Sequence, residues 1–139
     1  MPHVSYAQNG EDVRLWRAFR HLGGSEDFSD FTYVDVGANY PWKMSITASM
    51  YLFGARGLLV EADPDLAAEL RLARPEDQVA EVAAGSGEPH GGTKEQTLTF
   101  YRVPGTGLGT LDVNEAKVAR SRGFEVIEQT LRTESLDQL

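Results

Sequence analysis

Two acidic side chains end two apolar segments of this chain at a spacing that suits the binding of a small molecule. Asp35 lies near the end of the run Thr32–Val36, just before a turn that begins at Gly37. Glu61 ends a second apolar run. It follows the glycine turn by about 20 residues, which is the spacing of the ribose-binding acid in nucleotide-binding βαβ units. Ligands of open α/β sheets bind outside the carboxyl ends of the strands. We therefore expect residues 35–39 and Glu61 to border one ligand site.

The turn itself narrows the class of ligand. A dinucleotide-binding turn has three glycines, so that the pyrophosphate can approach bare backbone. This turn has only Gly37, and Tyr40 and Pro41 occupy positions where that motif needs backbone access. The Gly-Lys-Ser/Thr ending of a P-loop is also missing from the sequence. A nucleoside-like ligand without a pyrophosphate fits better, and nearby acids tolerate a cationic one such as S-adenosylmethionine.

Each acid also has an ordinary structural interpretation. Asp35 alone would be typical of a turn or helix-capping carboxylate, and Glu61 alone of a solvated strand end. Their position at two adjacent strand ends around a glycine turn favours the site interpretation over either alternative.

The segments around these residues predict strands that alternate with helices, which is the first half of a doubly wound α/β domain. The first part is expected to begin with a helix from the cap Asn9 to Gly23-Gly24, followed by a strand over Thr32–Val36. A helix with Ile46, Met50 and Phe53 on one face and a strand ending at Glu61 come next. A helix starting at Asp63-Pro64, with Leu66, Leu70 and Ala73 facing inward, then leads to a strand from Gln78 to Ala84. The second part is expected to contain an exposed loop from Gly85 to Glu95, an antiparallel strand from Gln96 to Val103, a turn over 104–109, a helix from Asp112 to Arg122, a strand from Phe124 to Leu131 and a helical start at Ser135.

Length and composition exclude several classes of protein. The 139 residues suit one domain, and the formal charge of −8 argues against a nucleic-acid ligand, which needs a basic surface. The chain has no cysteine, so disulfide and thiolate chemistry are excluded. No signal-peptide pattern opens the sequence, and no stretch reaches the about 20 apolar residues of a membrane span. We expect a cytoplasmic protein without a membrane partner.

Several motifs together resemble the FkbM family of S-adenosylmethionine-dependent methyltransferases. The resemblance is carried, in order, by Ser5-Tyr-Ala-Gln-Asn-Gly-Glu-Asp12, Val34-Asp-Val-Gly-Ala-Asn-Tyr-Pro41 with Ser45 and Thr47, Gly54-Ala-Arg-Gly-Leu-Leu-Val-Glu61, Arg74-Pro75, Ala83-Ala84-Gly85, Gly107-Leu-Gly-Thr-Leu111 and Thr133-Glu-Ser-Leu-Asp-Gln-Leu139. It implies a Rossmann-like class I methyltransferase fold and O-methylation of a hydroxyl on a small molecule or sugar. The sequence departs from the family at Gly109, where serine is usual, and the family's next block, an Ile-Asp-x-Glu-Gly strand end, is missing.

The resemblance also assigns cofactor-binding residues. Asp35, Gly37, Ala38 and Asn39 would line the methionine end, and Glu61 would hold the ribose hydroxyls. Ala62, Asp63 and Ala84 would lie near the adenine, while Tyr6, Gln8 and Glu11 would close over the site from the N-terminal segment within residues 1–24. Ser45 would lie at the start of the following helix. For Tyr6 and Gln8 a helix lead-in, and for Ser45 and Thr47 ordinary helix-surface polarity, remain the alternative interpretations.

No residue stands out as the general base that a hydroxyl acceptor requires, and no metal site is expected. His3, His21 and His90 fall at the terminus, at a helix end and in a loop. The sequence stops before the second half of a doubly wound sheet, so we expect one partial methyltransferase domain over residues 1–139, truncated after three parallel strands and an antiparallel extension. Such a chain is expected to associate with itself or with a missing C-terminal half, and not to turn over alone. The alternatives are a non-catalytic cofactor-binding or assembly module and, less in keeping with the turn, another nucleotide-binding enzyme such as a short dehydrogenase.

Overall fold

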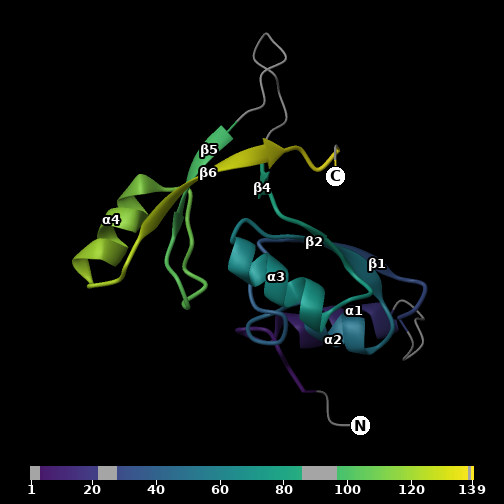
Figure 1. Cartoon of the computed structure of the whole chain (residues 1–139). Coiled ribbons are helices and arrows are strands. Elements are labelled where there is room, and N and C mark those ends of the chain that lie inside the picture. Colours follow the sequence, from purple (N-terminus) through teal and green to yellow (C-terminus); the bar gives the residue numbers. More distant parts are fainter. Residues whose placement is uncertain (1–3, 22–27, 86–96, 138) are drawn as a thin grey trace.

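The computed structural model describes residues 4–21, 28–85, 97–137 and 139 of the chain. Figure 1 shows the order and arrangement of the elements that these residues form. The elements are α1 (Glu11–His21), β1 (Thr32–Val36), α2 (Ala48–Leu52), β2 (Arg56–Val60), α3 (Pro64–Ala73), β3 (Gln78–Ala80), β4 (Ala83–Ala84), β5 (Thr97–Arg102), α4 (Val113–Ser121) and β6 (Ile127–Glu134).

The first sheet is parallel and has the order β1-β2-β3. Val36 on β1 pairs in register with Val60 on β2, and Val60 pairs with Ala80 on β3. The three strands therefore end together at one edge, as expected for consecutive strand-helix units. The predicted α/β class is confirmed by this sheet and by the helices that connect its strands.

The α1, α2 and α3 helices cover one face of this sheet (Figure 1). Leu70 of α3 packs on Leu59 of β2, and both side chains are fully buried. A second apolar cluster joins Phe28 and Met50 to partly buried aromatic side chains, among them Phe19 of α1. On the opposite face, Val34 and Val36 of β1 remain 58% and 52% exposed. An apolar strand of this kind is typical of a parallel sheet covered on both faces, but one face of β1 is exposed.

The second sheet is mixed, with the order β4-β6-β5. β5 runs antiparallel to β6, as predicted for residues 97–102, whereas β4 runs parallel to β6. The expected single strand from Gln78 to Ala84 is therefore divided, since its two halves pair in different sheets. The break at 81–82 lets the chain pass from one sheet to the other.

Local capping signals place two helices close to the predicted positions. Asp63 caps α3 by accepting a hydrogen bond from the Asp65 amide at 2.9 Å, and Pro64 takes the first helical position. Asp112 caps α4 in the same way, through the Asn114 amide at 2.7 Å. An N-cap carboxylate satisfies an amide that the helix leaves without an internal partner.

The start of α1 differs from the prediction that Asn9 caps it. The side-chain amide and backbone amide of Asn9 both donate to the Glu11 carboxylate, at 3.0 and 2.9 Å. Asp12 instead organises the entry to the helix, because its fully buried carboxylate accepts from the Ser5 hydroxyl and the Tyr6 amide at 2.6 and 2.8 Å. The predicted helix end at Gly23-Gly24 lies outside the described residues.

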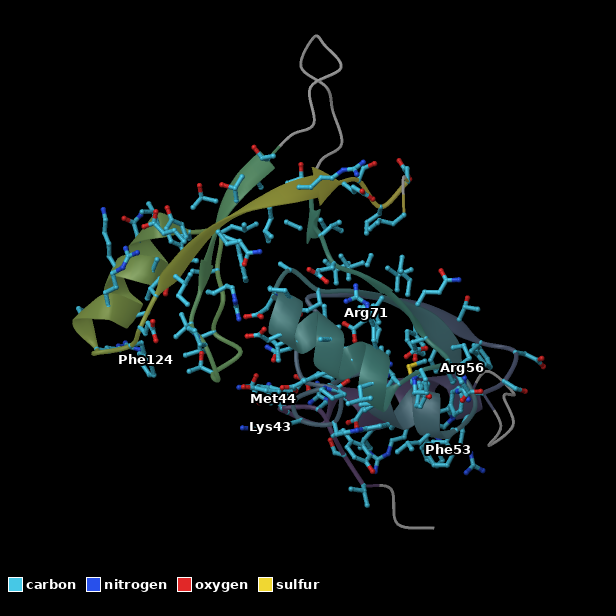
Figure 2. All side chains as sticks on the ribbon, viewed as in Figure 1. Lys43, Met44, Phe53, Arg56, Arg71 and Phe124 are labelled. Carbon is cyan, nitrogen blue, oxygen red and sulfur yellow. The ribbon has the colours of Figure 1, made fainter. Side chains whose placement is uncertain are left out.

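Three further boundaries differ from the sequence expectation. The helix predicted to begin before Ile46 is the short α2, and Ile46 lies outside it, 39% exposed, after Met44 has taken a positive φ of 57°. β6 begins at Ile127, so Phe124 lies just beyond α4 and outside the strand (Figure 2). Residues 135–137 form a turn where a helical start was predicted, and most of the predicted loop 85–95 lies outside the described residues.

Candidate functional site

A pocket of about 300 Å³ lies at the carboxyl ends of β1 and β2. One wall comes from the turn after β1 and from residues 60–63 and 66 around the start of α3. The facing wall comes from residues 82–84, from Phe100 on β5 and from the segment 107–111. The site thus forms where the two sheets meet, at the strand ends where the sequence predicts it.

Glu61 is part of the first wall and is 6% exposed. Its Oε2 accepts a hydrogen bond from the Asn39 amide at 2.7 Å, and its Oε1 accepts one from the Asp63 amide at 2.8 Å. A carboxylate has about four acceptor sites, so these two bonds fix its orientation and leave acceptor capacity on both oxygens. The solvated strand end considered for Glu61 is thereby wrong, because the side chain is buried and held from both sides.

The glycine turn is shaped by its backbone. The amides of Gly37 and Ala38 both donate to the Val60 carbonyl, at 2.8 and 3.2 Å, which ties the turn to the end of β2. Gly37 has a φ of +75°, a conformation that L side chains rarely adopt. A Cβ placed on Gly37 would meet no atom within 4 Å, so the φ angle, and not crowding by the protein, favours glycine here.

Six of the predicted site residues line the pocket, while the others lie elsewhere. The lining residues are Gly37, Asn39, Glu61, Ala62, Asp63 and Ala84. Ala38 is buried in the core with Leu59 and Leu70. Asp35 accepts a hydrogen bond from the Thr47 hydroxyl at 2.7 Å and does not line the pocket.

The N-terminal segment lies against the chain that follows the glycine turn. The Tyr6 carbonyl accepts from the Ser45 amide at 3.1 Å, and the Tyr6 ring lies 6.4 Å from the Trp42 ring. Gln8 is exposed and lies outside the pocket wall, as Tyr6 and Ser45 also do. Glu11 is engaged with Asn9, and those two hydrogen bonds lower the pKa of the Glu11 carboxyl below its ordinary value.

Ser45 and Thr47 belong to a buried polar network that sequence reasoning missed. At its centre is Arg74, which is fully buried and donates to the carboxylate of Asp77 at 2.8 Å. Arg74 also donates to the hydroxyl of Tyr33 at 2.7 Å, of Thr47 at 3.1 Å and of Ser45 at 3.4 Å. Helix-surface polarity is therefore wrong for Ser45 and Thr47, which are 1% and 6% exposed.

The same network reaches both of the first two strands. Asp77 accepts from the Tyr33 hydroxyl and from the Gly57 amide, the latter at 2.8 Å. Burial, together with the hydrogen bond to Asp77, raises the pKa of Tyr33 well above its ordinary value, so the phenol stays neutral and donates. Through Thr47, Arg74 is linked to Asp35, so the predicted Asp35 acts in this structure as part of the scaffold beneath the site.

The wall supplied by the second sheet contains pocket residues that the sequence analysis did not assign as ligands. Phe100 is 5% exposed, and a Cβ added to Gly109 would come within 2.3 Å of its ring. A serine at 109 would therefore require Phe100 to move, which gives a physical reason for glycine at this position. The sequence feature that could have indicated these pocket residues is the glycine-rich stretch 105–109. Its spacing alone does not predict a contact with the pocket.

An arginine joins the two walls at one side of the pocket. Arg102 at the end of β5 binds Asp63 at 3.1 Å and also forms an ion pair with Asp65 of α3. Burial would lower the pKa of Arg102, but its bonds to the two carboxylates outweigh that effect and raise it. Since Asp63 is paired with this guanidinium, Glu61 is the acidic side chain of the described pocket wall that has no ion-pair partner among the described residues.

The described residues contain no cluster of three or more His or acidic side chains that could hold a metal ion. None of the helices they form is long and apolar enough to cross a membrane. No histidine is part of the described pocket wall, and His21 lies at the end of α1.

Comparisons of the chain with protein-family models, with curated proteins and with solved structures return no match.

Proposed function

We propose that this chain forms the cofactor-binding part of an S-adenosylmethionine-dependent methyltransferase with a Rossmann-like fold. The observation that carries the proposal is Glu61, a buried carboxylate at the end of β2 that faces a pocket and is oriented by two backbone amides. A carboxylate with remaining acceptor capacity matches the adjacent hydroxyls of a ribose. The parallel order β1-β2-β3 supports the same proposal, because it places this carboxylate beside the turn after β1.

The charge of the pocket supports a nucleoside with cationic groups over a phosphorylated ligand. The described wall contains Glu61 and Asp63, of which Asp63 is paired with Arg102, and no Lys or Arg lines it. Phosphate recognition relies on Lys, Arg or clustered backbone amides. S-adenosylmethionine carries an ammonium and a sulfonium and has no phosphate. We propose a hydroxyl group on a small molecule or sugar as the methyl acceptor.

In such a reaction the acceptor oxygen attacks the methyl carbon, the carbon–sulfur bond breaks, and the hydroxyl proton passes to a base. The part of the chain described here would bind and orient the nucleoside end. Orientation of reactants can lower a barrier by about 7–11 kcal/mol in favourable cases. A general base increases the reaction rate by about 10²–10⁴-fold, and we assign this role to none of the described residues.

Calorimetric titration tests the proposal directly. We expect S-adenosylmethionine and S-adenosylhomocysteine to bind, and NAD to bind far more weakly because its pyrophosphate meets an acidic wall. Binding of NAD alone would favour a dehydrogenase-like site. Absence of binding by all three to a folded chain would contradict the proposal.

A non-catalytic binding or assembly module is a second candidate, favoured by the exposed face of β1 that carries Val34 and Val36. An apolar strand face of this kind is typical of a surface that contacts another polypeptide. A parent gene that encodes a downstream Asp-x-Glu-Gly strand would favour the enzyme. Folded protein that binds the nucleoside yet shows no transfer when joined to that strand would favour the module.

A further inference from the structure

We infer that the side chain of Asn39 latches the segment 103–111 over the pocket and thereby controls how long a ligand stays bound. The inference extends the proposed function, on which its ligand-binding part rests. It assigns to Asn39 a positioning role in addition to the direct cofactor contact expected from the sequence.

The segment 103–111 is a hairpin-like excursion with a well-anchored base. Tyr101 and Thr110 exchange backbone hydrogen bonds of 2.8 and 3.1 Å, which close the base next to β5. Arg102, within this base, is bound to Asp63 and Asp65 at the start of α3. Figure 1 shows the excursion in green, extending away from the second sheet between β5 and α4.

The distal part of the excursion is held by Asn39. The Asn39 side-chain amide donates to the Gly107 carbonyl at 3.0 Å, across 68 residues of sequence. Its side-chain oxygen accepts from the Tyr40 amide at 2.9 Å, which fixes the orientation of the donor. Asn39 has a φ of +58°, and asparagine tolerates this conformation better than most residues.

Asn39 also orients Glu61, the carboxylate proposed to bind the ribose hydroxyls. The backbone amide of Asn39 binds Glu61 at 2.7 Å, while its side chain binds Gly107. Glu61 and Gly107 are on opposite walls of the pocket. Asn39 therefore joins the two walls, and the ion pairs of Arg102 with Asp63 and Asp65 are a second connection between the same segments.

The fit of Gly107 against Asn39 is close enough to exclude a side chain. A Cβ on Gly107 would lie 2.5 Å from the Asn39 side-chain oxygen and 3.0 Å from the Tyr40 ring. Gly105, in the same excursion, has a similar positive φ, 71° against 67°, but a Cβ there would meet no atom within 4 Å. The two glycines thus form a matched pair, since alanine strains the backbone at both but disturbs the latch only at Gly107.

Hydrogen exchange of the ligand-free protein tests the latch without reference to any ligand. We expect Gly107→Ala and Asn39→Asp to speed exchange of the amides in 105–111 about two- to tenfold beyond Gly105→Ala, the range of one net hydrogen bond. Asn39→Asp keeps the shape and the acceptor but removes the donor to Gly107. Equal exchange in the Gly105→Ala and Gly107→Ala variants, with no effect of Asn39→Asp, would overturn the latch.

The rate of S-adenosylhomocysteine dissociation, measured by stopped flow, then tests whether the latch keeps a ligand bound. We expect Gly107→Ala to release this ligand faster than Gly105→Ala, with a smaller change in the association rate. Equal release rates from the two variants would show that the contact between Asn39 and Gly107 does not control how long the ligand stays bound. If the wild-type chain binds no S-adenosylhomocysteine, the proposed function fails, and the exchange experiment alone decides whether the latch exists.

Discussion

At the scale of single residues, Glu61 and Gly37 define the pocket in different ways. Glu61 contributes a fixed acceptor, since two backbone amides hold its carboxylate. Gly37 contributes a positive φ and open space, since a Cβ there would meet no atom within 4 Å. Each leads to a substitution whose effects on folding and on binding can be separated.

Replacing Glu61 should weaken S-adenosylhomocysteine binding by about 1.5–3 kcal/mol, the range of hydrogen bonds to a charged group. Glu61→Gln is the milder variant, because its side-chain oxygen still accepts from one of the backbone amides of Asn39 and Asp63, whereas alanine would leave both without their acceptor. Calorimetry measures the affinity, and chemical denaturation shows that the variant is folded. Unchanged affinity in a folded Glu61→Gln protein would remove this carboxylate from the site.

Gly37→Ala should reduce affinity at least about tenfold, or 1.4 kcal/mol, because its methyl group enters space that the pocket leaves open. It should also lower the free energy of unfolding by about 1–2 kcal/mol, the cost of a left-handed conformation for an L-residue. Gly123→Ala is the matched control, since Gly123 has a φ of +85°, has equal space around it and lies outside the pocket wall. A Gly37→Ala protein that binds as tightly as this control would place the ligand elsewhere.

At the scale of elements, a buried charge network fastens α3 to the first sheet. Arg74 follows directly after α3 and connects to β1 through Tyr33, while Asp77 connects to β2 through the Gly57 amide. Breaking a buried ion pair from one side costs more than the pair contributes, because the remaining charge is left buried without its partner. This network holds β1 and β2 near their amino-terminal ends, opposite the strand ends that border the pocket.

Arg74→Ala should therefore lower the free energy of unfolding by about 3–5 kcal/mol. Arg71→Ala is the control in the last turn of α3, where the Arg71–Glu81 ion pair is solvent-exposed and should contribute only about 0.2–1 kcal/mol. Figure 2 labels Arg71 on α3, and urea denaturation of both variants measures the difference. Similar small losses in both variants would show that the network does not stabilise the fold.

The entry to α1 depends on the charge of Asp12. Burial would raise the pKa of its carboxyl, but hydrogen bonds from Ser5 and from the amides of Tyr6, Val13 and Ala7 outweigh burial and lower it. A lowered pKa means that the stabilisation is complete above the ordinary value of 3.8 and is lost as pH falls through the folded-state value below it.

Asp12→Asn should cost about 1–3 kcal/mol at neutral pH, the penalty of leaving buried partners unsatisfied. The difference in stability between wild type and variant should stay constant down to about pH 4 and shrink at lower pH, where the wild-type carboxyl is protonated. Denaturation measured from pH 7 to lower pH in steps checks this. A stability difference that does not change with pH would show that the ionised form of Asp12 is not the source of the stabilisation.

At the scale of the whole molecule, the first sheet is open on one side. β1 is an end strand in the order β1-β2-β3, and Val34 and Val36 face away from the helices with more than half of their surface exposed. An edge strand with an apolar face is a template for pairing with another chain.

We expect the chain to self-associate through this face in a concentration-dependent way. The double variant Val34→Thr/Val36→Thr keeps β-branched side chains but adds polarity, so it should reduce the mass measured by light scattering. Leu72→Gln removes an 86% exposed apolar side chain from α3 and serves as the control, which should leave the association unchanged. A wild-type chain that stays monomeric at high concentration would contradict this prediction.

The sequence by itself determined where α3 and α4 begin, and it predicted a pocket at the strand ends. Asp63-Pro64 and Asp112 predict the starts of α3 and α4 because a capping carboxylate acts on amides two residues away. Gly37 and Glu61 predict a pocket at the strand ends, since consecutive parallel strands bring their carboxyl ends to one edge.

Only the tertiary structure decided how distant segments complete that site. The contact of Asn39 with Gly107, the binding of Arg74 to Tyr33 and the division of the third strand between two sheets depend on residues far apart in sequence. Propensity and periodicity act over a few neighbours and carry no information about such partners. Glu61 is a buried, oriented carboxylate for the same physical reason, because its burial comes from the packing of distant segments around it.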